Sequence, residues 1–225
     1  RDQPRSRGLG DVYKRQIKGF FFTVRCPYCG RVIEPNKSCC NKCRKEFPEM
    51  PLVRYTTGGY ICTSPFPYDG IFRRAVLNFK FHNCGAYAEL LSHEMVRSIK
   101  DVYRDREFDL VTCVPMHKDT LRERGYNQAE LLAKECARLL GIEYADLLVK
   151  TKKNKTQHSI NAAERAKNVI GVYSPIDKNL IKGKRILIID DIITTGSTLG
   201  ECARILNKCK CGEICCCTLC TSLLI

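Results

Sequence analysis

The chain has 225 residues, enough for one α/β domain and a small appendage. Its hydrophobic content of 44% is that of a globular protein, and no apolar run approaches the ~20 residues that a membrane helix needs. No segment has the pattern of a secretory signal, so the sixteen cysteines favour metal ligands and buried thiols in a cytoplasmic protein over a disulfide scaffold. A formal charge of +14 indicates anionic partners such as phosphates or nucleic acid.

The first sixteen residues do not fit the pattern of a folded segment. They have no apolar periodicity, and the segment 11–16 (DVYKRQ) resembles a translated sequencing adapter. We therefore interpret residues 1–16 as a non-native sequence joined to a truncated gene, and we leave them out of the fold prediction.

Two pairs of cysteines come next, each with two residues between its members, and ten residues separate the pairs. The four are Cys26, Cys29, Cys40 and Cys43. This spacing is typical of a structural Zn²⁺ site with four thiolates, which leaves no ligand position for a catalytic water. Cys39 could compete with Cys40, but only Cys40 keeps the spacing to Cys43. We predict a zinc ribbon over residues 20–50; the alternative is a loop of four thiols without a metal.

The segment 51–67 is rich in proline and glycine, which predicts a linker with turns and one short strand near residues 60–62. Beyond it, apolar residues at helical spacing predict one helix over 71–81 and another over 86–102. Lys80 stands at the end of the first helix, off its apolar face. It could serve a binding site or simply face solvent.

A second apolar run, 109–115 (DLVTCVP), predicts a buried strand that ends at Pro115. The loop after it carries Lys118, Arg122 and Arg124 and leads into a helix that runs to about residue 140. A basic loop at a strand end can accept a pyrophosphate group, but the two arginines could equally belong to a charged helix start. We interpret His117 as a surface residue.

The segment 150–157 (KTKKNKTQ) contains four lysines and has no apolar periodicity, which predicts a mobile basic loop. A run of this kind is usually only solvated. Because it lies between two predicted sheet elements, it could also close over a phosphate site as a lid.

Residues 186–189 (ILII) predict a strand that is buried on both faces, and Asp190 and Asp191 end it. A hydroxyl-rich turn follows, and helical spacing begins at about Ser197. The positive end of a helix and its free N–H groups suit a phosphate, while adjacent carboxylates suit ribose hydroxyls or a Mg²⁺ ion. An ordinary strand-to-helix turn is the alternative, but such a turn does not require two acids and four hydroxyls together.

Residues 213–220 (EICCCTLC) predict one more strand. Cys217 and Cys220 have the spacing of metal ligands, but alternation along a strand sends Cys215 and Cys217 to one face and Cys216 to the other. Thiols that pack as small apolar side chains are therefore favoured over a second metal site.

The stretch 186–198 resembles the phosphoribosyl pyrophosphate (PRPP) signature of type I phosphoribosyltransferases, which has four apolar residues, two acids and a Thr-Thr-Gly-Ser-Thr turn. It is not a Walker A loop, because no Gly-Lys-Ser/Thr follows. With the zinc ribbon, and with the Val-Pro strand end followed by Arg-x-Arg-Gly-Tyr-Asn-Gln at 122–128, residues 20–222 resemble the ComF family. That family joins an N-terminal zinc ribbon to a phosphoribosyltransferase domain and is associated with competence.

The resemblance implies an α/β fold of the type I phosphoribosyltransferase kind over residues 68–225, with three layers and a central, mostly parallel sheet. It implies that the acid pair binds the ribose of PRPP directly or through Mg²⁺. The 5′-phosphate would lie on Thr194, Thr195, Gly196, Ser197 and Thr198. The pyrophosphate would face the loop with Pro115, Arg122, Arg124 and Gly125. A lid would include Lys150, Lys152 and Gln157, with lysines where the family commonly has arginines. The implied catalytic residues are Asp190, Asp191, Arg122 and Arg124.

Two functions remain open on this interpretation. The first is transfer of phosphoribose from PRPP with release of pyrophosphate. The second is a non-catalytic PRPP or nucleotide sensor that binds single-stranded DNA and works with the DNA-uptake machinery. Only 27 residues follow Thr198, too few for a base-binding hood, so the ribbon and residues 44–67 would have to supply the acceptor side.

Overall fold

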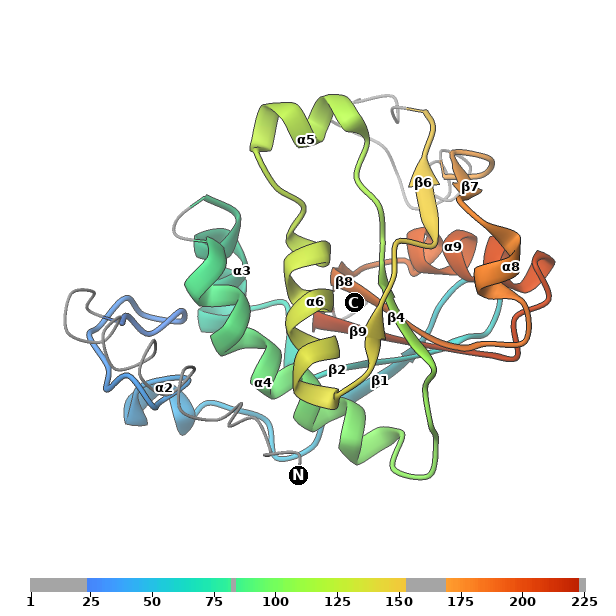
Figure 1. The fold of residues 1–225 in the computed structure, drawn as a ribbon. Helices are drawn as coiled ribbons and strands as arrows, with labels where there is room; N and C mark the ends of the chain where they lie inside the picture. The colour runs from blue at the N-terminus through green and yellow to red at the C-terminus, as the bar shows by residue number, and fades with distance from the viewer. Residues whose placement is uncertain (1–23, 82–83, 153–168, 223–225) are drawn as a thin grey trace, which may run out of the picture.

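The fold is a seven-stranded sheet with helices on both faces, seen in a computed structural model that describes residues 24–81, 84–152 and 169–222 (Figure 1). The predicted non-native segment 1–16 lies outside these residues. The strands of the sheet are β1 (Leu52–Tyr55), β2 (Ile61–Ser64), β3 (Phe66–Pro67), β4 (Leu110–Cys113), β5 (Glu143–Tyr144), β8 (Arg185–Ile193) and β9 (Glu213–Thr221). Their order is β1-β2-β9-β8-β4-β5, and β3 also pairs with β9.

Every pairing in this sheet is parallel except that of β1 with β2, which confirms the predicted central, mostly parallel sheet. A separate antiparallel pair is formed by β6 (Leu148–Lys150) and β7 (Tyr173–Pro175). The helices are α2 (Asn41–Arg44), α3 (Gly70–Phe81), α4 (Cys84–Val102), α5 (Lys118–Arg124), α6 (Gln128–Leu140), α8 (Lys178–Ile181) and α9 (Ser197–Lys208).

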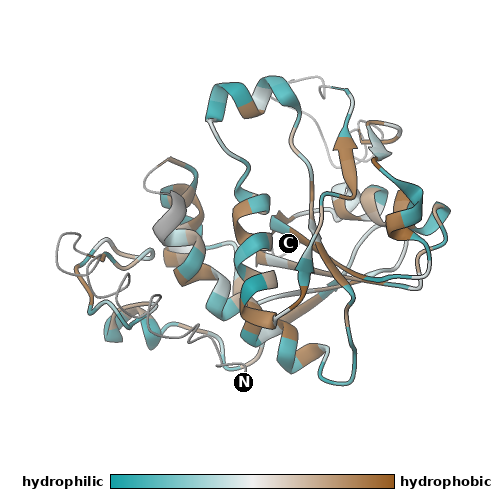
Figure 2. Ribbon diagram, in the orientation of Figure 1, coloured by the Kyte–Doolittle hydropathy of each residue, from teal (hydrophilic) through white to brown (hydrophobic). Residues whose placement is uncertain are grey.

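Alternation along the buried strand β8 divides the core into two clusters. Leu187 and Ile189 pack with α3, α4 and α6, whereas Ile186 and Ile188 pack with α8 and α9. All four side chains are fully buried, as expected for a parallel strand covered on both faces. The result is the predicted three-layer arrangement, with α3, α4 and α6 on one side of the sheet and α8 and α9 on the other (Figure 1). The covering helices carry both hydrophobic and hydrophilic residues (Figure 2).

Residues 51–67 are not the linker that we predicted from their prolines and glycines. The short strand expected near 60–62 is present as β2, but β1 and β3 are strands as well, and both β2 and β3 pair with the central strand β9. The prolines are compatible with this because Pro51, Pro65 and Pro67 lie at the ends of these short strands, where a missing N–H removes little of the ladder.

The N-terminal segment packs onto the main sheet through four aromatic rings. Tyr28 lies edge-on to Phe47, Phe66 and Phe72 at centroid distances of 5.0, 5.6 and 5.9 Å, and Phe66 stacks on Phe72 at 4.3 Å. Arg44 donates a hydrogen bond of 2.5 Å to Glu94 of α4. One hydrophobic cluster therefore continues from the cysteine-rich segment into the α/β core.

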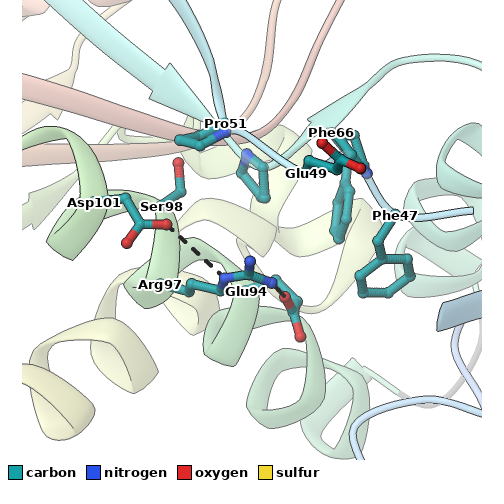
Figure 3. Close-up of a pocket in the computed structure, with 10 residues that line it drawn as sticks. Phe47, Glu49, Pro51, Phe66, Glu94, Arg97, Ser98 and Asp101 are labelled. Atoms are coloured by element: carbon teal, nitrogen blue, oxygen red, sulfur yellow. Dashed lines mark ion pairs between the residues drawn. The ribbon is translucent and has the colours of Figure 1, made fainter. Parts of the chain in front are cut away.

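Beyond the rings, residues 47–51 run along α4 and line a small hollow (Figure 3). There Arg97 lies 3.9 Å from Glu94 and 3.9 Å from Asp101, so the helix surface that faces this segment is charged. Within the described ranges, no helix is both long and apolar enough to cross a membrane.

Candidate functional site

The acid pair lies on β8, near the carboxyl end of the strand. We predicted that Asp190 and Asp191 would end this strand, but β8 continues to Ile193 because the equally long β9 keeps pairing with it: Asp190 stands opposite Thr218, and Ile193 opposite Thr221. The backbone N–H of Asp191 donates to Oδ1 of Asp190 at 2.8 Å. Burial, together with the charge of Asp191, raises the pKa of the Asp190 carboxyl well above its usual range.

Two lysines oppose this cluster of negative charge. Lys80, in the last turn of α3, places its Nζ 3.0 Å from Oδ2 of Asp191, and both side chains are largely buried. Lys150 acts in the same direction on Asp190, while its own pKa is lowered by burial. The structure thus resolves the alternatives for Lys80: it contacts the acid pair.

We predicted that Lys150 lies in a basic loop, but the structure places it in a strand. It is the last residue of β6, opposite Tyr173 of β7, and its Nζ lies 5.6 Å from the centre of the Tyr173 ring. Pairing between segments distant in the chain makes this part of the predicted loop a strand. Lys152 is exposed just beyond it, and Gln157 lies outside the described residues.

The hydroxyl-rich turn leads directly into α9. Gly196 precedes the helix with φ of 73° and has no side chain that could cap it, but Oγ1 of Thr195 accepts from the N–H of Ser197 at 3.4 Å. Oγ1 of Thr195 and Oγ of Ser197 lie 2.9 Å apart. Thr194 and Thr198 are half-buried beside them. Backbone N–H groups at the positive end of a twelve-residue helix, next to hydroxyls, can bind a phosphate group.

The turn between β1 and β2 packs against the hydroxyl-rich turn 194–198. The N–H of Thr57 donates to the carbonyl of Gly196 at 3.3 Å. A Cβ on Gly196 would come within 2.7 Å of the Cα of Thr56, so only glycine fits there. The β1–β2 turn comes from the segment that the sequence predicted as a linker.

The predicted loop after Pro115 is largely helical. His117 caps α5 by accepting from the N–H of Asp119 at 3.3 Å, and Gly125, with φ of 80°, ends the helix. His117 is buried, contrary to our prediction of a surface residue. Arg122 and Arg124 are exposed on α5, none of whose seven residues is buried. The described contacts join neither arginine to the acid pair, so their role stays a prediction.

The end of the 122–128 motif ties three elements together. Asn127 caps α6 by accepting from the N–H of Ala129 at 3.1 Å, and its Nδ2 donates to the carbonyl of Val114 at 3.0 Å. The hydroxyl of Tyr126 donates to the carbonyl of Phe79 at 3.3 Å and also to that of Lys80. The ends of β4 and α3 and the start of α6 are therefore held by two adjacent side chains, a role that the motif spacing alone did not reveal.

The four predicted cysteine ligands come together at the N-terminal end of the fold. The Sγ atoms of Cys26, Cys29, Cys40 and Cys43 all lie within 4.8 Å of one another, and those of Cys29 and Cys40 are 3.6 Å apart. Sulfur atoms about 2.3 Å from a tetrahedral ion would have such separations, so the group could hold a metal ion such as Zn²⁺.

Neighbouring groups favour the thiolate form at Cys29 and Cys40, whereas burial raises the pKa of Cys26 and Cys43. Partial burial acts to raise the pKa of Cys29, but hydrogen bonds from Arg31 and from the other thiols lower that pKa to about 6. The Nε of Arg31 donates to Sγ of Cys29 at 3.4 Å. Cys39 is buried outside the group of four, as its spacing predicted.

Comparison with known proteins gives the family. Residues 127–223 match the phosphoribosyl transferase domain family. The chain is 31% identical over 212 residues to Competence protein F of Haemophilus influenzae. The match covers 92% of this chain and 87% of that protein. The chain belongs to the ComF family. It is also 28% identical to Competence protein ComFC of Bacillus subtilis, with 84% and 74% covered, and 25% identical to DNA utilization protein YhgH of Escherichia coli, with 81% and 78% covered.

Membership in the ComF family confirms the resemblance that we predicted for residues 20–222. The matched phosphoribosyl transferase domain contains both the acid pair and the hydroxyl-rich turn. The cysteine cluster precedes it and contributes the second part of the ComF architecture.

Proposed function

We propose that this ComF protein binds PRPP through Asp190, Asp191 and the turn 194–198, and that it transfers the phosphoribosyl group to an acceptor with release of pyrophosphate. The observation that carries the proposal is the acid pair on β8, which is followed within six residues by the hydroxyl-rich N-terminus of α9. A ribose diol and a 5′-phosphate need these two kinds of group side by side.

In this proposal each group has one task. The carboxylates accept hydrogen bonds from the ribose hydroxyls, or hold a Mg²⁺ ion that would neutralise charge on the pyrophosphate. The turn 194–198 donates N–H and O–H groups to the 5′-phosphate. Arg122 and Arg124, with the lysines of the predicted lid, supply positive charge to the departing pyrophosphate. Catalysis is then mainly electrostatic, because the protein stabilises the leaving group while an acceptor attacks C1 of the ribose.

We assign binding of the acceptor molecule to the N-terminal part of the chain. The turn between β1 and β2 lies against the hydroxyl-rich turn 194–198, and the cysteine-rich segment packs onto α3 and α4. We propose that the ribbon over residues 20–50 carries a structural Zn²⁺ ion on its four cysteines and that it keeps this part of the protein folded.

A second function is supported by the names of the relatives, which refer to competence and DNA utilization. In this version the protein is a PRPP or nucleotide sensor in the cytoplasm that binds single-stranded DNA through its basic surface and works with the DNA-uptake machinery. The formal charge of +14 is consistent with such a partner.

Pyrophosphate release separates the two functions. The protein is incubated with PRPP, Mg²⁺ and a panel of bases and amines, and PRPP affinity is measured by calorimetry. Release with one acceptor supports the transferase; tight PRPP binding without release from any acceptor supports the sensor. The matched control, Asp190→Asn with Asp191→Asn, should bind no PRPP, and wild-type affinity in that variant would overturn the assignment of the pocket. For the second function, affinity for single-stranded DNA should fall steeply as salt is raised.

A further inference from the structure

We propose that Lys80 is a ligand-binding residue, and that its ammonium group binds the pyrophosphate end of PRPP. The proposal rests on the proposed function, because it assigns a further residue to the same site. In this structure the ammonium group lies 3.0 Å from Oδ2 of Asp191.

Lys80 lies between the two halves of the proposed site. Its side chain reaches the acid pair, where the ribose would bind. Its backbone carbonyl accepts from the hydroxyl of Tyr126, which belongs to the 122–128 motif assigned to the pyrophosphate. A cation at the junction of ribose and pyrophosphate is next to the bond that breaks in the transfer, where negative charge develops on the leaving group.

The helix that carries Lys80 is held at several points. Phe72, Val76 and Phe79 of α3 are buried in the core. Asn78 donates to the carbonyl of Pro27, between two of the metal-binding cysteines, at 3.1 Å. The backbone of Lys80 is therefore fixed, while its side chain keeps 23% of its surface exposed and has four rotatable bonds. A change of partner needs only the side chain to move.

Binding of PRPP would move the Lys80 ammonium away from Asp191 and would also bring the anion to which it moves. Ribose hydroxyls that donate to Asp191 compete for the carboxylate oxygen on which the ammonium now rests. A largely buried ammonium without a partner is costly, so Lys80 needs another anion nearby. The pyrophosphate group is the anion that the ligand brings with it.

Comparing two ligands tests this assignment. PRPP and ribose 5-phosphate share the ribose and the 5′-phosphate, and only PRPP carries the pyrophosphate. Calorimetric affinities are measured for wild type, Lys80→Met, Lys80→Arg and the control Lys100→Met. Lys100 is exposed in the last turn of α4, and no described contact joins it to the acid pair.

We expect Lys80→Met to weaken PRPP binding about tenfold or more, the effect of one lost charge-assisted hydrogen bond. Its affinity for ribose 5-phosphate should change less than about threefold, well under the 1.4 kcal/mol that a tenfold change represents. Lys80→Arg should retain most of the PRPP affinity, and Lys100→Met should match wild type for both ligands.

Three results would overturn the proposal. Equal losses for the two ligands would make Lys80 a purely structural residue. Unchanged PRPP binding would show that it makes no contact with the ligand, and tighter binding of both ligands would make it only a counter-ion of Asp191. If wild type binds neither ligand, the proposed function itself fails, which is a different outcome from a Lys80 variant that behaves like wild type.

Discussion

Gly200, in the first turn of α9, packs directly against the backbone carbonyl of Thr57. A Cβ on Gly200 would come within 2.0 Å of that oxygen and within 2.9 Å of the carbonyl carbon, and backbone atoms cannot yield to it as a flexible side chain would. The first turn of α9 and the β1–β2 turn therefore pack against each other without room for a single methyl group.

Gly200→Ala should lower the free energy of unfolding by about 2–3 kcal/mol, the cost of overpacking. It should also weaken PRPP binding, because α9 must move away from the turn. Denaturant titration and calorimetry measure the two effects. Gly59→Ala is the matched control in the same turn: no atom of the described residues lies within 4 Å of its Cβ, so only its φ of +82° costs stability, roughly 1–2 kcal/mol, and PRPP affinity should stay unchanged. Equal affinity losses in both variants would contradict the predicted role of the close contact.

Asp190→Asn should stabilise the ligand-free protein at neutral pH. A carboxyl whose folded-state pKa is raised favours the protonated folded state, so its contribution to stability falls as pH rises from the unfolded value of about 3.9 through the folded pKa. Asparagine removes that charge and keeps the oxygen that accepts from the N–H of Asp191. We expect a melting temperature higher by about 2–4 °C at pH 7, about 1 kcal/mol for a chain of this size, together with loss of PRPP binding.

The same experiment at low pH provides its own control. Near pH 4 Asp190 is protonated in the folded wild type, so the difference in melting temperature between wild type and Asp190→Asn should shrink. A variant that melts below wild type at pH 7 would show that the ionised carboxylate stabilises the empty site.

Asp109 should have the opposite pH dependence. Hydrogen bonds from Arg185, from its backbone N–H at 2.8 Å and from Nη2 at 2.8 Å, lower the pKa of Asp109. Its contribution to stability is therefore fully present above the unfolded pKa of about 3.9 and is lost as pH falls through the lower folded value. Asp109→Asn should be less stable than wild type at pH 6, and the two should converge as the pH approaches 2. A difference that does not depend on pH would exclude this ion pair as its cause.

We predict that two adjacent cysteines, Cys39 and Cys40, differ in their importance for metal binding. Cys40→Ala should remove the bound metal, because Cys40 is one of the four converging thiols, whereas Cys39→Ala should keep one ion per chain. Metal content by mass spectrometry and melting temperature with and without a chelator measure this. The melting temperature of Cys40→Ala should be low and insensitive to the chelator. Metal lost from both variants would mean that Cys39 takes part in the site.

Local patterns were enough to predict much of this fold. The apolar run 186–189, the helical spacing over 71–81 and the cysteine spacing each reflect interactions within a short stretch of chain, and β8, α3 and the cysteine cluster follow them. The acid pair and the hydroxyl-rich turn were predictable for the same reason, since strand, turn and helix are contiguous there.

The remaining features depend on contacts between distant segments. The strands β2 and β3 exist because β9 lies beside them, and nothing in the proline-rich sequence 51–67 indicates that neighbour. Lys80 reaches Asp191 only because α3 packs against β9, the neighbour of β8, and Lys150 is in a strand only because Tyr173 pairs with it. Such long-range contacts produce no periodic pattern of residues in either segment, so they cannot be predicted from local sequence.

The three adjacent thiols on β9 allow opening of the sheet to be detected by alkylation. Cys215, Cys216 and Cys217 are completely buried, and burial raises the pKa of Cys215 to about 11 and those of the other two well above the ordinary range. Only a thiolate that meets the reagent is alkylated, so these residues are unreactive while β9 lies between β2 and β8. The rate at which they are alkylated under native conditions therefore measures how often the centre of the sheet opens, without any label added to the chain.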